Sequence, residues 1–243
     1  MKEKTVGIVL AAGRGSRMKS DTNKPYLLLR DRPVLYYALK AFEDSFVDEI
    51  ILVAGETEIG YCRREVVEKF GFQKVTHIVT GGAERYHSVF HGLQAVEQCD
   101  YVFIHDGARP FVTGDILKRA YEAVQRDKAC VVGMPVKDTV KLADEQGFAV
   151  STPRRDLVWA IQTPQVFSFP LVKKAYTAFL EQEQILSAEG VHITDDAMVV
   201  ERFSDTRVRL VEGSCENIKI TTPEDLIVAE GFLAAGLSCP CLS

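Results

Sequence analysis

The amino-acid sequence predicts an α/β fold in which a doubly wound, mostly parallel sheet has helices on both faces. Short apolar runs alternate with segments of helical periodicity along most of the chain, and a glycine-rich loop follows the first apolar run. The alternation breaks at residues 137–167, where polar turn residues between two short runs predict a protruding β-hairpin arm. The 243 residues contain no evident linker, which favours a single domain over 1–243.

The first half of the chain consists of repeated strand and helix units. Apolar runs predict four buried strands, at residues 6–10, 49–54, 75–79 and 101–106. Each of the first three runs is followed by residues with helical spacing. The first helix should cover 34–42 after Pro33, and the second should run from Thr57 as N-cap to about Phe70, with Gly71 just past its end. A third helix should continue onward from Ser88. Such units pair in parallel through right-handed crossovers, which predicts helices on both faces of the sheet.

The second half begins in the same way and ends differently. A helix from Thr113 to about Gln125 and a strand at 129–134 precede the arm. After the arm, residues 159–167 carry the chain back to the body. The sequence then predicts a helix opened by Pro170 and ending near Gly190, and a helix start capped at Thr194. A strand at 207–211 and a last helix from Thr222 to about Ala235 complete the chain.

Composition excludes several classes of protein. A net charge of -5 and a pI of about 5.6 argue against a general nucleic-acid binder. No apolar run approaches the length of a membrane span, and the N-terminus enters a strand directly, so we expect no membrane association and a cytoplasmic protein. The six cysteines lack the paired spacing of a zinc site, which predicts reduced, mostly buried thiols.

The loop after the first strand predicts a clamp for a triphosphate. Its small residues leave backbone amides exposed to a phosphate: Ala11, Ala12, Gly13 and Gly15. Arg14, Arg17 and Lys24 bring positive charge to the same place. The loop fits neither a Walker motif nor the dinucleotide fingerprint, because the third glycine is missing and Lys24 precedes a proline.

Two further strand ends should meet this loop. Residues 81–88 form a second glycine-containing loop, and Asp106 follows a buried strand, so both reach the crevice outside the carboxyl ends of the strands. A carboxylate beside phosphates implies a divalent cation between them, which makes Asp106 a candidate Mg²⁺ ligand. His105 reads as structural, while Arg155 on the arm is either solvated or within reach of a phosphate in a partner's crevice.

Several motifs together give the chain a family resemblance. The opening Leu-Ala-Ala-Gly-x-Gly-x-Arg-Met and Lys-Pro are similar to those of nucleotidyltransferases that join a sugar or polyol phosphate to a nucleotide. With His-Asp-Gly-Ala-Arg-Pro at 105–110, Thr-Asp-Asp-Ala at 194–197 and Asn-Ile-Lys-Ile-Thr-Thr-Pro-Glu-Asp at 217–225, the whole chain closely resembles the 2-C-methyl-D-erythritol 4-phosphate cytidylyltransferases of the non-mevalonate isoprenoid pathway.

The resemblance implies a fold, an activity and partners. The fold would be a Rossmann-like domain of the nucleotide-diphospho-sugar transferase type, with two copies joined as a homodimer through the 137–167 arms. The substrates would be CTP and a polyol phosphate, with Mg²⁺ as cofactor and pyrophosphate released.

The resemblance also implies site residues. The CTP site would comprise Ala11, Ala12, Gly13, Gly15, Arg17, Lys24, Gly82, Ala83, Arg85 and Ser88. The acceptor site would comprise Asp106, Arg109, Thr194 and Lys219, together with Thr139 and Arg155 from the partner's arm. Catalysis would depend on Arg17, Lys24, Arg155 and Lys219, and Asp106 would hold the metal. The chain has Glu216 where the family often has Asp, which leaves the metal role of Glu216 or Asn217 open.

Two alternatives remain at this stage. A ribitol 5-phosphate cytidylyltransferase shares most of these motifs and differs in its acceptor pocket. A non-catalytic nucleotide-sensing module would keep the glycine loop without needing Lys24, Asp106 and Lys219 together.

Overall fold

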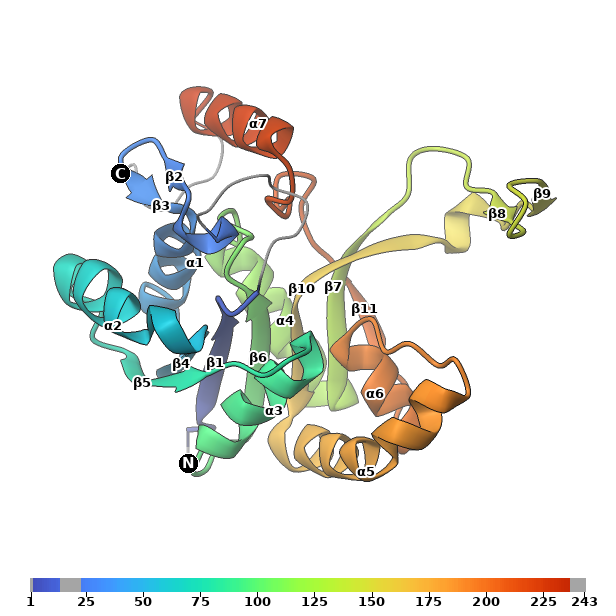
Figure 1. The fold of residues 1–243 in the computed structure, drawn as a ribbon, viewed down its shortest axis with the longest axis horizontal. Helices are drawn as coiled ribbons and strands as arrows, with labels where there is room; N and C mark the ends of the chain where they lie inside the picture. Colours follow the sequence, from blue (N-terminus) through green and yellow to red (C-terminus); the bar gives the residue numbers. More distant parts are fainter. Residues whose placement is uncertain (1, 14–22, 237–243) are drawn as a thin grey trace.

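The fold is built on a seven-stranded sheet, seen in the computed structural model of the chain, which describes residues 2–13 and 23–236 (Figure 1). The strand order is β11-β7-β10-β6-β1-β4-β5. In chain order the strands are β1 (Thr5–Leu10), β4 (Glu49–Ala54), β5 (Val75–Thr80), β6 (Tyr101–Asp106), β7 (Ala129–Pro135), β10 (Trp159–Ser168) and β11 (Arg209–Glu212).

Most neighbouring strands are parallel, as predicted. Strand β1 pairs in parallel with β4 and β6, β4 with β5, and β11 with β7. The exception is β10, which lies antiparallel between β6 and β7 because it returns the chain from the arm. All six residues of β1 are buried, which is why this strand reads as a continuous apolar run and not as an alternating one.

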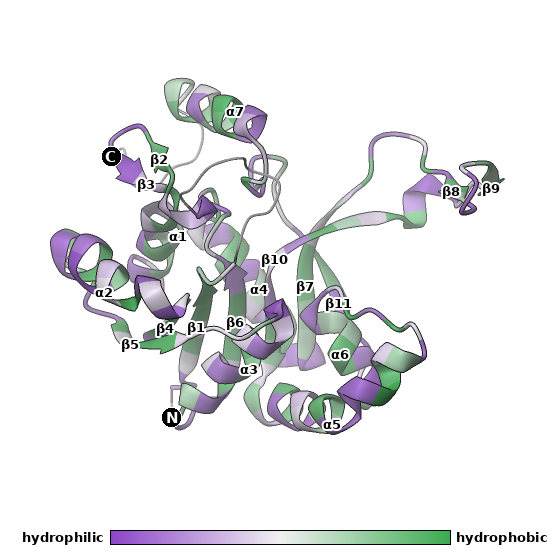
Figure 2. Cartoon of the chain, viewed as in Figure 1, coloured by the Kyte–Doolittle hydropathy of each residue, from purple (hydrophilic) through white to green (hydrophobic). Residues whose placement is uncertain are grey.

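Helices cover both faces of the sheet, and together the layers bury two apolar clusters. One face is packed by α1 (Val34–Glu43), α2 (Ile59–Tyr61), the π-helical segment η3 (Cys62–Glu68), α4 (Gly114–Asp127) and α7 (Pro223–Ala234). The other face is packed by α3 (Arg85–Ala95), α5 (Phe169–Ala188) and α6 (Asp196–Phe203). Figure 2 shows hydrophobic residues along the central strands, while the helices around them carry both hydrophobic and hydrophilic residues.

Two expected helix starts are wrong, each because a neighbouring carboxylate makes the cap. The second helical segment begins with the 3-10 turn η2 (Glu56–Glu58), where the Glu58 carboxylate accepts a hydrogen bond from the backbone amide of Gly55. Thr57 lies inside this turn. Helix α6 is capped by Asp195 and not by Thr194, because the Asp195 carboxylate accepts from the amide of Met198 at 2.9 Å.

Two other predicted helix starts are confirmed. Thr113 caps α4 by accepting a hydrogen bond from Ile116, and Thr222 begins α7, where Asp225 accepts from its amide at 2.8 Å. Cys62, Cys99 and Cys130 are buried free thiols, as predicted, whereas Cys239 and Cys241 lie outside the described residues.

The predicted hairpin arm is present and projects from the body of the molecule (Figure 1). Its two strands, β8 (Leu142–Ala143) and β9 (Ala149–Ser151), pair antiparallel, and the 3-10 turn η4 (Arg155–Leu157) follows them. A second small hairpin, β2 (Leu28–Leu29) with β3 (Arg32–Pro33), follows the 3-10 turn η1 (Lys24–Tyr26). None of the helices described is long and apolar enough to span a membrane.

Candidate active site

A cavity of about 220 Å³ opens where β1 and β6 end. The carboxyl ends of parallel strands are where ligands bind in open α/β sheets. The cavity brings together parts of the two loops and of the segment before α7, and it is lined by Leu10, Ala11, Ala12, Gly13, Lys24, Pro25, Arg85, Asp106, Ala108, Lys219 and Thr221. The predicted convergence of these chain segments on one crevice is therefore confirmed.

The glycine-rich loop presents fewer backbone amides than its sequence suggests. The amides of Ala11 and Ala12 both donate to the carbonyl of Val53 in β4, at 2.7 and 2.9 Å, so they hold the loop against the sheet. Gly13 is the first loop residue beside open space. Gly15 and Arg17 lie outside the described residues.

The second loop packs directly on the first. A Cβ atom at Gly81 would stand 2.3 Å from the Cβ of Ala12, so this close approach requires glycine. Ser88 is buried, and its hydroxyl accepts a hydrogen bond from the amide of Gly82 at 3.0 Å. Gly82 and Ser88 thus stabilise the loop, while Ala83 is exposed beside it.

Lys24 is held beside the cavity by its neighbours in sequence. The side-chain amide of Asn23 donates to the Glu58 carboxylate at the start of the second helical segment. Tyr26 is buried, and its hydroxyl lies 3.1 Å from the Cys62 thiol. These contacts fix the backbone on both sides of Lys24.

Asp106 is the centre of charge in the cavity. Its carboxylate lies 3.2 Å from Nε of Arg85, 2.8 Å from Nζ of Lys219 and 3.8 Å from Nε of Arg109. Burial by itself would raise the pKa of Asp106, but the three cations outweigh burial and hold that pKa well below its usual range. The carboxylate is therefore ionised throughout the physiological range.

Arg85 extends the charge network away from the cavity. Its guanidinium donates both Nη groups to the carboxylate of Asp196, at 2.9 Å each, and Asp196 also accepts from the hydroxyl of Tyr176. Burial opposes the charge of Arg85, yet Asp196 and Asp106 raise its pKa well above the usual value. Arg85, expected to contact the nucleotide, is thus bound between two carboxylates. Asp196 is fully buried, and its sequence context as a first-turn acid gave no sign of this role.

His105 is structural, as predicted, and it supports the backbone of Asp106. Its Nε2 lies 3.1 Å from the carbonyl of Arg109, which only accepts, so Nε2 must hold the proton. Its Nδ1 then accepts from the hydroxyl of Thr163 at 3.0 Å, and that hydroxyl accepts from the amide of Asp106 at 3.1 Å. Burial lowers the pKa of His105 to about 4, which keeps the ring neutral. Sequence reasoning missed Thr163.

Arg109 and Lys219 are tied to each other through the backbone. Nη1 of Arg109 donates to the carbonyl of Asn217 at 2.8 Å, and the amide of Ile220 donates to the carbonyl of Ala108 at 2.8 Å. These bonds fix the segment that contains Lys219 against the end of β6.

Three expected acceptor residues lie away from the cavity in the single chain. Thr139 and Arg155 are exposed on the arm, and Nη1 of Arg155 donates to the carbonyl of Lys137 at 3.1 Å. Thr194 lies in the connection between α5 and α6 and does not line the cavity.

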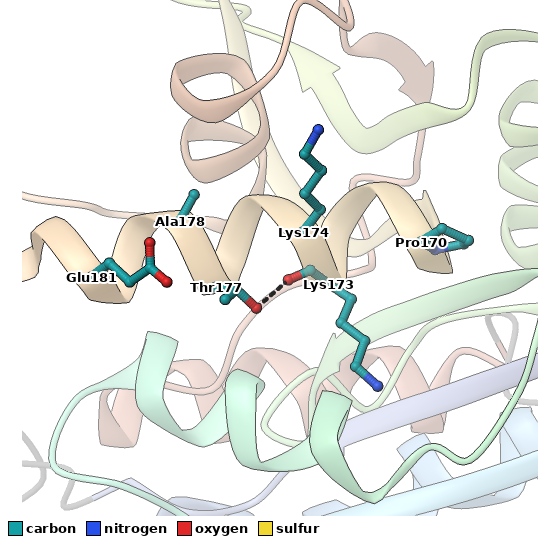
Figure 3. A pocket seen from close by; sticks show the side chains of 6 residues that line it. All are labelled: Pro170, Lys173, Lys174, Thr177, Ala178 and Glu181. Atoms are coloured by element: carbon teal, nitrogen blue, oxygen red, sulfur yellow. Dashed lines mark hydrogen bonds between the residues drawn. The ribbon is translucent and has the colours of Figure 1, made fainter.

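A larger hollow lies on the surface along α5 (Figure 3). Lys173, Lys174 and Glu181 line it, and the hydroxyl of Thr177 donates to the backbone carbonyl of Lys173 within the helix. Because this hollow lies on one helix and contains no buried charged group, the cavity at Asp106 is the better candidate for catalysis.

Comparison with known proteins shows the family of the chain. The family model described as 2-C-methyl-D-erythritol 4-phosphate cytidylyltransferase (IspD) matches residues 5–235. Proteins of that name from Lachnoclostridium phytofermentans and Caldanaerobacter subterraneus are each 50% identical to this chain, over 95% and 93% of its length and 97% of theirs. The crystal structure of 4-diphosphocytidyl-2C-methyl-D-erythritol synthase from Anaerococcus prevotii superposes with a TM-score of 0.82 at 33% identity, covering 96% of both chains. The chain therefore belongs to the 2-C-methyl-D-erythritol 4-phosphate cytidylyltransferase family.

Proposed function

We propose that this chain transfers a cytidylyl group from CTP to 2-C-methyl-D-erythritol 4-phosphate, giving 4-diphosphocytidyl-2-C-methyl-D-erythritol and pyrophosphate. The observation that carries the proposal is the cavity at the ends of β1 and β6, where Asp106 contacts three cationic side chains beside a glycine-rich loop. The names of relatives that share half of their residues with this chain support the choice of acceptor. The proposed compartment is the cytoplasm.

The proposed chemistry needs positive charge and alignment more than it needs a base. An oxygen of the acceptor phosphate, anionic at neutral pH, attacks the α-phosphorus of CTP; the new P–O bond forms as the bond to the bridging oxygen breaks, and pyrophosphate leaves. The main barriers are repulsion between two polyanions and the in-line approach of the nucleophile. Lysine and arginine side chains that are held in place lower both barriers, because they neutralise the phosphate charges and align the reacting groups.

The residues divide between the two substrates. Lys24 at the glycine loop, with Arg17, would neutralise the phosphates of CTP, and Gly13 gives the phosphates close access to the backbone. Lys219 and Arg109, which both lie beside Asp106, would bind the acceptor phosphate. Asp106 keeps these two cations close together despite their mutual repulsion.

The residues present fit a Mg²⁺ ion as cofactor. Among the described residues no group of three His, Cys, Asp or Glu side chains could hold a metal, so a cage made by the protein alone is absent there. Mg²⁺ is commonly bound by one carboxylate together with phosphate oxygens and water, and Asp106 is the carboxylate that lines the cavity. When bound, the ion would neutralise phosphate charge; Asp106 would hold it through acceptor positions left beside Arg85 and Lys219.

We also propose that two copies join through the 137–167 arms. Large apolar side chains are exposed on and next to the arm hairpin: Phe148 at 72%, Val150 at 67% and Leu157 at 69%. A short hairpin of this kind is marginal without something to pack on, and a second copy offers the simplest partner. Thr139 and Arg155 would then reach the partner's crevice and complete its acceptor site.

The direct test measures pyrophosphate release with Mg²⁺ and CTP, with 2-C-methyl-D-erythritol 4-phosphate and ribitol 5-phosphate offered separately. We expect turnover with the methylerythritol acceptor alone. Turnover with ribitol 5-phosphate alone would contradict the proposal and indicate the other polyol. CTP binding at equilibrium without turnover of either acceptor would indicate a nucleotide-sensing module.

A further inference from the structure

Strand β10 leaves the sheet ladder just where it passes Asp106. Its pairing with β7 shifts register between Ile161 and Gln165, and its pairing with β6 begins only at Gln165. The residues between these points therefore depend on other partners for their polar groups. Thr163 is one of them, and it is buried.

The side chain of Asn217 supplies the missing partner. Asn217 is fully buried, and its Nδ2 donates to the carbonyl of Thr163 at 2.9 Å and to Oε1 of Gln162 at 3.1 Å. Gln162 is oriented independently, since its own Nε2 donates to the carbonyl of Ser214 at 2.8 Å. Asn217 thus faces two acceptors, and an amide NH₂ satisfies both whereas a carboxylate satisfies neither.

These bonds close a ring through the reactive centre. From Thr163 the ring continues through its hydroxyl to the amide of Asp106, at 3.1 Å, and from the Asp106 carboxylate to Nζ of Lys219, at 2.8 Å. Lys219 is two residues after Asn217, and the Asn217 carbonyl accepts from Arg109 at 2.8 Å. One buried amide therefore connects β10 to the segment that carries Lys219, and the backbone carbonyl of the same residue binds Arg109 from the end of β6.

We propose that Asn217 is a positioning residue for the transfer reaction: its side chain fastens the segment that carries Lys219 to Thr163, and its carbonyl holds the side chain of Arg109, so both cations are placed relative to Asp106. The inference deepens the proposed function and rests on it. It assigns Asn217 a positioning role, because its amide nitrogen is engaged by Gln162 and Thr163 and the residue does not line the cavity at Asp106; its Oδ1 is buried without a hydrogen-bond partner among the described residues.

The test replaces Asn217 by Asp, which keeps the shape and removes both donors. We expect kcat to fall by about a hundredfold, because displacement of reacting groups by about 1 Å costs that much. The dissociation constant for CTP, measured by calorimetry without acceptor, should stay within about threefold, because the hydrogen bonds of the ring join Thr163, Asp106, Lys219 and Asn217, on the proposed acceptor side of the site. Gln182→Glu adds the same charge on the exposed surface of α5 and should leave both values unchanged.

A second pair of variants separates positioning from loss of folding. Thr163→Val removes the hydroxyl in the ring and should lower kcat comparably, whereas Thr163→Ser restores the hydroxyl and should recover most of the turnover. In the double variant Asn217→Asp/Thr163→Val, kcat should be scarcely lower than in the worse single variant, because both changes break one ring.

Three results would overturn the role of Asn217 while the wild type turns over its substrates. They are near-normal kcat in folded Asn217→Asp, losses that multiply in the double variant, and CTP affinity that falls in parallel with kcat. A wild-type chain that releases no pyrophosphate with either acceptor would overturn the proposed function itself, and this inference with it.

Discussion

At the scale of single residues, one carboxylate organises the cations of the site. Asp106 is nearly buried and contacts Arg85, Lys219 and Arg109, so the group keeps an excess of positive charge. That excess suits a triphosphate and a phosphate monoester as substrates, whose charges would complete the balance. Asp196 holds the guanidinium of Arg85 from the side opposite Asp106.

Replacing Lys24 tests the cation at the glycine loop. We expect Lys24→Ala to lower kcat by about a hundredfold, because loss of one preorganised group at the developing charge has that effect. Pyrophosphate release and a thermal melt would be measured together. Lys69→Ala, which removes an exposed lysine from the far end of the second helical segment, is the matched control. Near-normal turnover of folded Lys24→Ala would refute the assignment.

His105 makes stability depend on pH. Its folded pKa is about 4 because of burial, while the ordinary value is 6.5, so the unfolded chain binds a proton more readily between these values. Stability from this residue is complete above about pH 6.5 and is lost as the pH falls toward 4, by up to about 3 kcal/mol. The free energy of unfolding, measured with urea at several pH values in this range, should depend less steeply on pH in His105→Gln than in the wild type. The exposed His192→Gln should show the same dependence on pH as the wild type. Equal slopes for wild type and His105→Gln would contradict this reading.

At the scale of elements, β10 and α6 are joined at the start of the helix. Asp195 caps α6 through one oxygen and accepts from Nε2 of Gln165 in β10 through the other, at 3.0 Å. Oε1 of Gln165 in turn accepts from the amide of Ala197 at 2.9 Å. This junction presents Asp196 to Arg85, so the start of α6, which does not itself line the cavity, determines where an arginine of the cavity stands.

Removal of the α6 cap should therefore lower the free energy of unfolding. We expect Asp195→Ala to lower the free energy of unfolding by about 1 kcal/mol, the usual value for a lost cap. Chemical denaturation would measure it against Asp205→Ala, an exposed aspartate in the connection after the same helix. If the two variants unfold at the same urea concentration, the cap contributes nothing.

At the scale of the whole molecule, the proposed dimer would make the site a property of two chains. Arg155 and Thr139 stand on the projecting hairpin, outside the cavity of their own chain (Figure 1). The exposed apolar side chains of the arm match what an interface between copies would cover.

Mixing two inactive variants tests this sharing of sites. Arg155→Ala and Lys219→Met should each be nearly inactive, yet a mixed dimer would contain one site with both residues intact. After unfolding and refolding together in equal amounts, about a quarter of wild-type activity should return, because half of the dimers are mixed and each has one working site. Refolding each variant alone is the control, and no recovery in the mixture would contradict the shared site.

The order of elements could be predicted from the sequence because each buried strand is a local apolar run. The central contacts could not, since they join residues far apart in the chain: the amide of Asp106 meets Thr163 across 57 positions, and Asn217 meets Thr163 across 54. Asp196 read as an ordinary first-turn acid for the same reason. The amides of Ala11 and Ala12 were expected to face a phosphate, but the need to satisfy the carbonyl of Val53 turned them toward the sheet.

The central claim is that this chain transfers a cytidylyl group to methylerythritol phosphate with the help of the cations around Asp106. The variant Lys219→Met tests this claim most directly. Wild type and variant would be compared for pyrophosphate release with CTP and each polyol phosphate, and for CTP binding without acceptor. The account predicts that the wild type uses the methylerythritol acceptor, and that the variant folds and binds CTP but turns over at least about a hundredfold more slowly. A folded Lys219→Met variant with near-normal turnover would contradict it.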